Sequence, residues 1–196
     1  MKKESQVIFD KNVIEFVTVA AEFCAFLERA ESMKRSTFVD TTLKILPLLY
    51  LKASMLPKCE MIGDESPETY VTEEIYEVLR INLASILAEK DDYLEVFLPD
   101  MAYSDEPIKK NISEDLADIY QDIKDFIFVF QLGLNETMND SLAICQENFG
   151  LLWGQKLVNT MRALHDVKYS PKARGEDEEE EEYEPENNED CHCEDD

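Results

Sequence analysis

Apolar residues recur with helical periodicity along most of this chain, and that periodicity restricts the fold to an all-helical class. In residues 13–31, for example, Phe16, Ala20, Phe23 and Leu27 fall on one face of a helix. Strict alternation of apolar and polar residues, which marks half-buried strands, is almost absent. The sequence therefore predicts an all-α fold, a single helical bundle-like domain of about six helices.

Cap and turn signals divide this pattern into separate helices. The helices expected from them cover residues 13–31, 37–56, 72–90, 113–133, 136–148 and a last stretch that ends near 165. The core face expected for the third helix consists of Val78, Leu79, Leu83, Ile86 and Leu87. Pro47 predicts a kink or break in the second helix, because proline lacks a backbone donor. Gly150 and Gly154 are expected to interrupt the chain before the last helix, and a short helix is expected before Pro99.

The chain is strongly acidic, with 44 Asp and Glu against 19 Lys and Arg and a formal net charge of −25. Residues 175–196 contain 14 of these acids and no Lys or Arg. Such a segment cannot bury enough apolar surface to offset the entropy of ordering, so residues 171–196 are predicted to be a disordered acidic tail. The other parts expected are an N-terminal arm of residues 1–11 and the helical domain of residues 12–170.

The negative charge also limits the partners. An acidic surface repels phosphate backbones, so general nucleic-acid binding is excluded and a basic protein partner fits better. The longest apolar run, residues 45–51, is far shorter than the roughly 20 residues of a membrane span. The N-terminal residues lack the apolar stretch of a signal peptide, so the expected location is the cytoplasm, with reduced cysteines. The tail tripeptide Cys191-His192-Cys193 lacks the second ligand pair of a structural zinc site.

Four aspartates lie on one side of the helix expected at residues 113–133. Asp115, Asp118, Asp122 and Asp125 fall at positions i, i+3, i+7 and i+10. The last three have no Lys or Arg three or four positions away to offset their mutual repulsion. Three interpretations follow: a stripe that faces water, which we prefer, a pairing with a base on another helix such as Arg80, or a metal site.

The metal interpretation takes a specific form. The segments EEIYE, residues 73–77, and EDLAD, residues 114–118, resemble the paired acidic motifs of the all-α nucleoside triphosphate pyrophosphohydrolases. The resemblance implies a magnesium ion that bridges phosphate oxygens. The ligands that it implies are Glu74, Glu77, Asp115 and Asp118, to which we add Asp122. The second motif opens with Asp where the family has Glu, and both glutamates are expected to point away from the core face of their helix.

Longer stretches resemble a bacterial family known as a domain of unknown function. They are NVIEFVTVAAEFCAFLE, LKILPLLYLKASMLP, ISEDLADIYQDIKDFIFVFQLGLNETMND and WGQKLVNTMRALH, and the resemblance spans most of residues 12–169. It implies a soluble bacterial all-α protein and assigns no catalytic or binding residues.

The function expected from these observations is a non-enzymatic interaction or adaptor module that needs no cofactor. Only two histidines are present, and no phosphate-binding GxxxxGK loop occurs. The alternative is a magnesium-dependent pyrophosphohydrolase that uses the acidic pairs.

Overall fold

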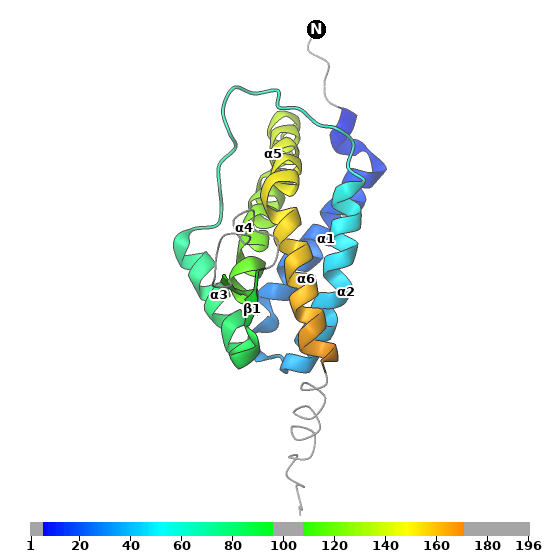
Figure 1. Ribbon diagram of the computed structural model, residues 1–196. Helices are drawn as coiled ribbons and strands as arrows, with labels where there is room; N and C mark the ends of the chain where they lie inside the picture. Colours follow the sequence, from blue (N-terminus) through cyan, green and yellow to red (C-terminus); the bar gives the residue numbers. More distant parts are fainter. Residues whose placement is uncertain (1–5, 96–107, 171–196) are drawn as a thin grey trace, which may run out of the picture.

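The protein, seen here in a computed structural model, is described over residues 6–95 and 108–170 and is built from helices (Figure 1). Its α-helices are α1 (Lys11–Glu28), α2 (Arg35–Ser54), α3 (Glu73–Leu87), α4 (Ile112–Gln131), α5 (Asn135–Asn148) and α6 (Gly154–Tyr169). The short elements are η1 (Gln6–Phe9), η2 (Ala30–Ser32), η3 (Ala88–Lys90), β1 (Asp92–Leu94), β2 (Lys109–Asn111) and a π-helical turn, η5 (Phe149–Trp153). The predicted all-α class is confirmed.

Helix α4 is the centre of the bundle, in contact with α1, α3, α5 and α6. Its apolar residues Leu116, Ile119 and Ile123 are completely buried, and Phe126 and Val129 are nearly so. The sequence predicts this position, since the second half of the helix is apolar on almost every side.

The segment before α4 differs from the expected short helix. Residues 92–94 form β1, which pairs antiparallel with β2, with Asp92 opposite Asn111. Asp91 then caps α4, because its carboxylate accepts hydrogen bonds from the backbone N–H and the hydroxyl of Ser113 at 2.7 and 2.6 Å. The prediction of a helix is therefore wrong for residues 92–94, and the rest of it, up to Pro99, lies outside the described residues.

The two predicted interruptions have different outcomes: α2 is not broken at Pro47, whereas the α-helical pattern does stop between α5 and α6, at residues 149–153. Helix α2 continues through Pro47, which lies on its exposed side. Helices α5 and α6 are joined by η5, whose wider turn lets the backbone N–H of Gly154 donate to the Phe149 carbonyl. The turn places Trp153 in the core, where its ring stacks on Phe16 with centroids 6.5 Å apart.

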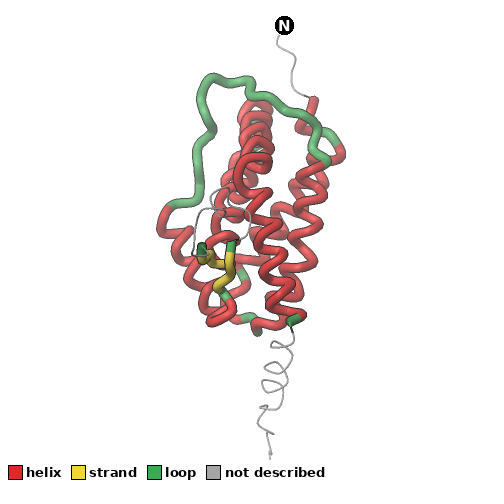
Figure 2. Tube along the Cα trace, in the orientation of Figure 1, coloured by secondary structure: helices red, strands yellow, loops and turns green. Residues whose placement is uncertain are grey.

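The connection from α2 to α3 is a long ordered loop that arches past α5 (Figure 2). We call residues 57–71 the strap.

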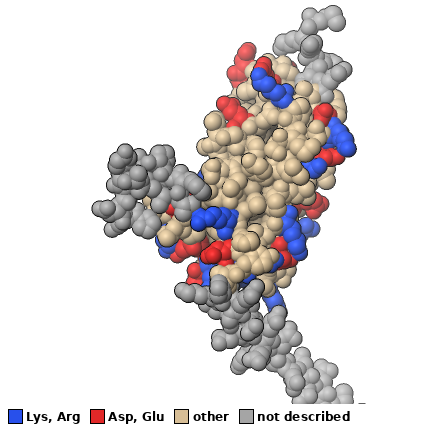
Figure 3. Space-filling model, turned by 45° about the vertical axis from the view of Figure 1, so that its right-hand side comes forward, with Lys and Arg blue, Asp and Glu red and all other residues tan. Residues whose placement is uncertain are grey.

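The face of the molecule shown in Figure 3 carries few charged residues across its middle. Exposed apolar side chains of the whole molecule include Leu48, Leu51, Leu151, Leu152 and Val158 on α2, η5 and α6.

At the ends of the chain, Ile8 of η1 is buried with 1% of its surface exposed, although residues 1–11 are predicted to be an arm. The predicted tail, residues 171–196, and its Cys191-His192-Cys193 tripeptide lie outside the described residues. Within the described ranges, no helix combines the length and the hydrophobicity needed to span a bilayer.

Candidate functional site

Side chains of α5 hold the first half of the strap. The carboxylate of Asp140 accepts hydrogen bonds from the backbone N–H groups of Ile62 and Gly63 at 2.7 and 2.8 Å. The side-chain oxygen of Gln146 accepts from the backbone N–H of Cys59 at 3.0 Å. These bonds satisfy strap donors that have no helix or sheet to join.

Helix α4 holds the second half of the strap through Asp125. One carboxylate oxygen, Oδ1, accepts from the backbone N–H groups of Tyr70 and Val71 at 2.7 and 2.8 Å. Burial nevertheless raises the pKa of Asp125, because the loss of water outweighs the two hydrogen bonds that favour the charged form. The aspartate therefore acts as an anchor for the strap.

Asp122 lies one turn before Asp125 and is half-buried. Its Oδ1 atom accepts a hydrogen bond from the side-chain amide of Asn148, on α5, at 2.6 Å. Burial raises the pKa of Asp122, and the neighbouring carboxylates of Asp125 and Asp118 raise it further.

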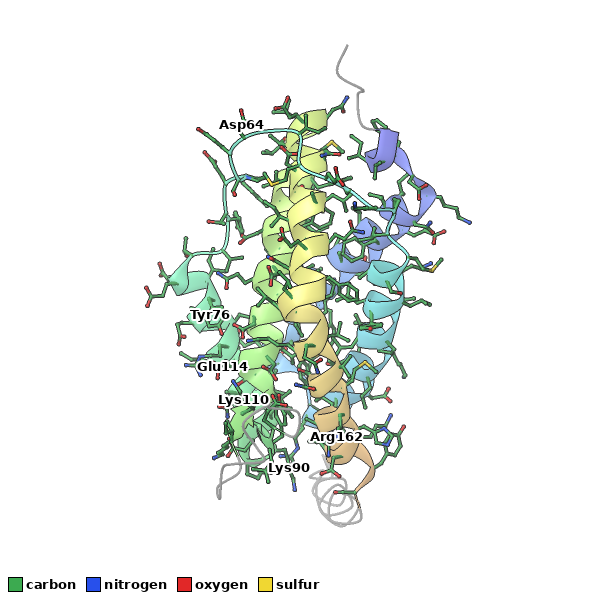
Figure 4. All side chains as sticks on the ribbon, turned by 45° about the horizontal axis from the view of Figure 1, so that its top comes forward. Asp64, Tyr76, Lys90, Lys110, Glu114 and Arg162 are labelled. Carbon is green, nitrogen blue, oxygen red and sulfur yellow. The ribbon has the colours of Figure 1, made fainter. Side chains whose placement is uncertain are left out.

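Asp118 joins three helices. It accepts a hydrogen bond from the hydroxyl of Tyr76 on α3 at 2.8 Å and forms an ion pair with Lys156 of α6. Burial lowers the pKa of Lys156, but the bond to Asp118 reverses this effect and leaves the pKa raised. In Figure 4, Tyr76 lies on α3 beside the first turns of α4, where Glu114 is labelled.

Asp115 is the most buried of the four aspartates, with 4% of its surface exposed. Its carboxylate accepts a hydrogen bond from the hydroxyl of Tyr93, on β1, at 2.5 Å. Burial raises the pKa of Asp115, while the bond from Tyr93 acts in the opposite direction. The hydrogen bond from Tyr93 to Asp115 therefore holds β1 against α4.

The preferred prediction of a stripe that faces water is therefore wrong, because all four aspartates bind groups from other parts of the fold. The cross-helix alternative holds for Asp118, but the base is Lys156. Arg80 instead pairs with Glu77 on its own helix at 2.7 Å.

The implied magnesium ligands are not brought together. Glu74 is exposed on the first turn of α3, and Glu77 is occupied by Arg80. Asp115 and Asp118 are held by Tyr93 and Lys156, respectively. In the part of the chain that the structure describes, no group of three or more His, Cys, Asp or Glu residues is arranged to hold a metal ion.

A cavity of about 330 Å³ lies between the strap, α4 and α5. Its apolar wall includes Phe126, Val129, Ile144 and Leu152. Its acidic lining residues are Glu68 from the strap and Asp122 and Asp125 from α4. No Lys, Arg or His lines this cavity within the described residues.

The outer surface of the strap continues this acidic character. We define the strap face as Asp64, Glu65, Glu68, Glu73, Glu74 and Glu136, all of which are exposed. Glu136 belongs to it because its carboxylate would lie 3.5 Å from a Cβ built at Gly63. The basic residue of the strap, Lys58, is paired with Glu60 at 2.8 Å. None of the six strap-face carboxylates has an ion pair within residues 6–95 and 108–170.

Sequence reasoning missed the residues of α5 that anchor the strap. Asn139 and Asp140 are almost completely buried, and Gln146 lies one heptad after Asn139. The available signal is their position beside the apolar stripe of Leu142 and Cys145, since polar side chains near a core stripe must find partners.

Residues 7–170 match the family model described as Domain of unknown function (DUF5063). A crystal structure of protein BF1032 from Bacteroides fragilis is 93% identical, with a TM-score of 0.78, and the match covers 86% of this chain and 99% of that chain. No curated protein matches the chain.

Proposed function

The chain belongs to the DUF5063 family, and we propose that it is a non-enzymatic interaction module that binds a basic segment of a partner protein through the strap face. The observation that supports this function is the set of six exposed strap-face carboxylates without an ion pair among the described residues. A basic segment supplies the missing counter-charges.

The arrangement of the strap suits an interface. Its backbone is fixed by Asp125, Asp140 and Gln146, so its outward carboxylates are presented without a large ordering cost on binding. Electrostatic attraction between the strap face and a basic segment also accelerates encounter, and added salt weakens it.

Two acids of α4, Asp115 and Asp118, are poorly placed for catalysis. Asp115 accepts a hydrogen bond from the hydroxyl of Tyr93. Asp118 accepts a hydrogen bond from the hydroxyl of Tyr76 and forms an ion pair with Lys156. A general base needs a position from which it can reach a substrate proton. The hydrogen bonds and the ion pair of these two carboxylates instead hold β1, α3 and α6 against α4.

Two full-chain variants of equal net charge test the proposed function. The strap variant carries Asp64→Asn, Glu65→Gln, Glu73→Gln and Glu74→Gln. The control variant removes four exposed acids elsewhere, by the changes Glu22→Gln, Glu31→Gln, Glu147→Gln and Asp166→Asn. A labelled lysine- and arginine-rich peptide is titrated with each protein, and fluorescence anisotropy gives Kd at low and at physiological salt.

We expect the strap variant to bind about fourfold or more weakly than the control, because four exposed ion pairs contribute about 0.2–1 kcal/mol each. The difference should shrink as salt is added. Equal losses in the two variants would mean that the peptide responds only to net charge, and the strap face would then be the wrong site.

A further inference from the structure

We propose that the cavity beneath the strap binds a primary ammonium group carried on an aliphatic stem. A lysine side chain of the bound segment is one source of this group, and in that form the inference rests on the proposed function. A free alkylamine has the same chemistry and would bind in the same way.

The cavity places acid and apolar surface side by side. Asp122 and Asp125 line it on the α4 side, and Glu68 lines it on the strap side. Phe126, Val129, Ile144 and Leu152 form the neighbouring apolar wall. Concave sites of this kind bind ligands whose polar end is fixed by a few groups and whose body is apolar.

Each α4 carboxylate in the cavity has one oxygen in use and one available. Oδ1 of Asp122 accepts from Asn148, and Oδ1 of Asp125 accepts from the backbone of Tyr70 and Val71. No described residue donates a hydrogen bond to Oδ2 of either aspartate. The two residues are three positions apart on α4, so their side chains are neighbours on the helix surface.

This pattern favours an ammonium ion over the other cations. An ammonium is a compact charge with three donors, and it can take single oxygens from two different carboxylates. A guanidinium prefers both oxygens of one carboxylate, which Asp122 and Asp125 do not offer. A metal ion would need converging ligands, and the described residues contain no suitable group of three.

The electrostatics of the cavity favour a positively charged ligand. Burial raises the pKa of both Asp122 and Asp125, so a cation bound beside them would favour their charged forms. Lys156 acts on Asp122 through its charge, but it forms its ion pair with Asp118. A bound ammonium would supply this positive charge, and the apolar wall would cover its stem.

The test is an NMR titration of the full chain with four small probes. Nα-acetyl-lysine methylamide and n-butylamine carry the ammonium, Nα-acetyl-norleucine methylamide carries only the stem, and Nα-acetyl-arginine methylamide carries the guanidinium. The backbone amides of Tyr70 and Val71 and the side-chain amide of Asn148 report on the cavity. We expect saturable shifts with an ammonium probe, none with norleucine, and binding of arginine weaker by about tenfold or more.

Two variants connect the shifts to the carboxylates. Asp122→Asn and Asp125→Asn each keep the oxygen that accepts from Asn148 or from the strap, so the fold is retained while the charge is lost. Each should weaken ammonium binding by about tenfold or more, whereas Glu22→Gln, on the exposed face of α1, should leave it unchanged.

The outcomes separate the alternatives. Binding of the lysine probe alone assigns the site to peptide lysines, and equal binding of butylamine assigns it to any alkylamine. Equal shifts with norleucine or with arginine, or no binding of either ammonium probe, overturn the inference. The proposed function is tested separately, because the strap variant leaves all three acidic lining residues of the cavity, Glu68, Asp122 and Asp125, intact.

Discussion

Gly154 provides a direct test of the π-helical turn between α5 and α6. Its φ of −64° and ψ of −40° are ordinary helical values, so helix propensity alone predicts that Gly154→Ala stabilises the protein by about 0.4–1 kcal/mol. The surroundings predict the opposite. A Cβ at this position would lie 2.3 Å from the Phe149 carbonyl oxygen and 2.9 Å from Cδ2 of the Phe149 ring.

The size of the effect follows from that contact. The oxygen at 2.3 Å belongs to the backbone, and it is the acceptor for the N–H of Gly154 itself, so it cannot move away without losing that hydrogen bond. Overpacking typically costs about 1–3 kcal/mol, and this contact lies at the severe end. We expect a net loss of about 2 kcal/mol, or a decrease in Tm of about 4–8 °C for a domain of this size.

Gly150→Ala is the matched control within the same turn. A Cβ at Gly150 has nothing within 4 Å, and the residue is exposed. We therefore expect this change to stabilise the protein by about 0.4–1 kcal/mol. Urea unfolding followed by circular dichroism gives the free energy of unfolding for both variants. An equal gain in stability from both changes would refute the steric explanation and, with it, the geometry of η5.

Three further predictions concern the core and the acidic face of α4. Lys156→Met should lower the free energy of unfolding by about 1–3 kcal/mol in urea titrations, because it leaves the half-buried carboxylate of Asp118 without a counter-charge. Trp153→Ala should lower it by about 3–5 kcal/mol in the same assay, since it removes a completely buried ring and its hydrogen bond to the Cys145 carbonyl at 3.1 Å. The pKa of Asp122 is raised, so the folded protein binds a proton at Asp122 more readily than the unfolded chain does. The contribution of Asp122 to the free energy of unfolding therefore improves as the pH falls through the raised pKa toward the ordinary value of 3.8. Asp122→Asn should remove that part of the pH dependence, which unfolding measurements from about pH 7 to pH 4 would detect.

The helices were predictable where their apolar stripe matches the surface that they bury. In α3, Leu79, Leu83 and Leu87 are buried as expected, but Val78 is 56% exposed. Periodicity gives the direction of the stripe, but the number of neighbouring helices decides its width. The same limit applies to Gly154, because nothing in the sequence indicates that a wider turn could carry the helix past it.

The acidic face of α4 was located but misinterpreted. Sequence spacing shows that Asp118 has no base within one turn, whereas its partner Lys156 lies 38 residues away. Tyr93 is separated from Asp115 by 22 residues and belongs to a strand that was not predicted. Partners of this kind depend on tertiary packing, which local spacing cannot report.

The antiparallel pairing of β1 and β2 has a practical consequence for protein engineering. The backbone N–H of Glu95 donates to the Ile108 carbonyl at 2.9 Å, so the chain leaves and re-enters the described fold at adjacent points. A reporter or affinity sequence placed between Glu95 and Ile108 would therefore begin and end at neighbouring positions of the fold. Each doubling of the insert length costs only about 0.6 kcal/mol of closure entropy.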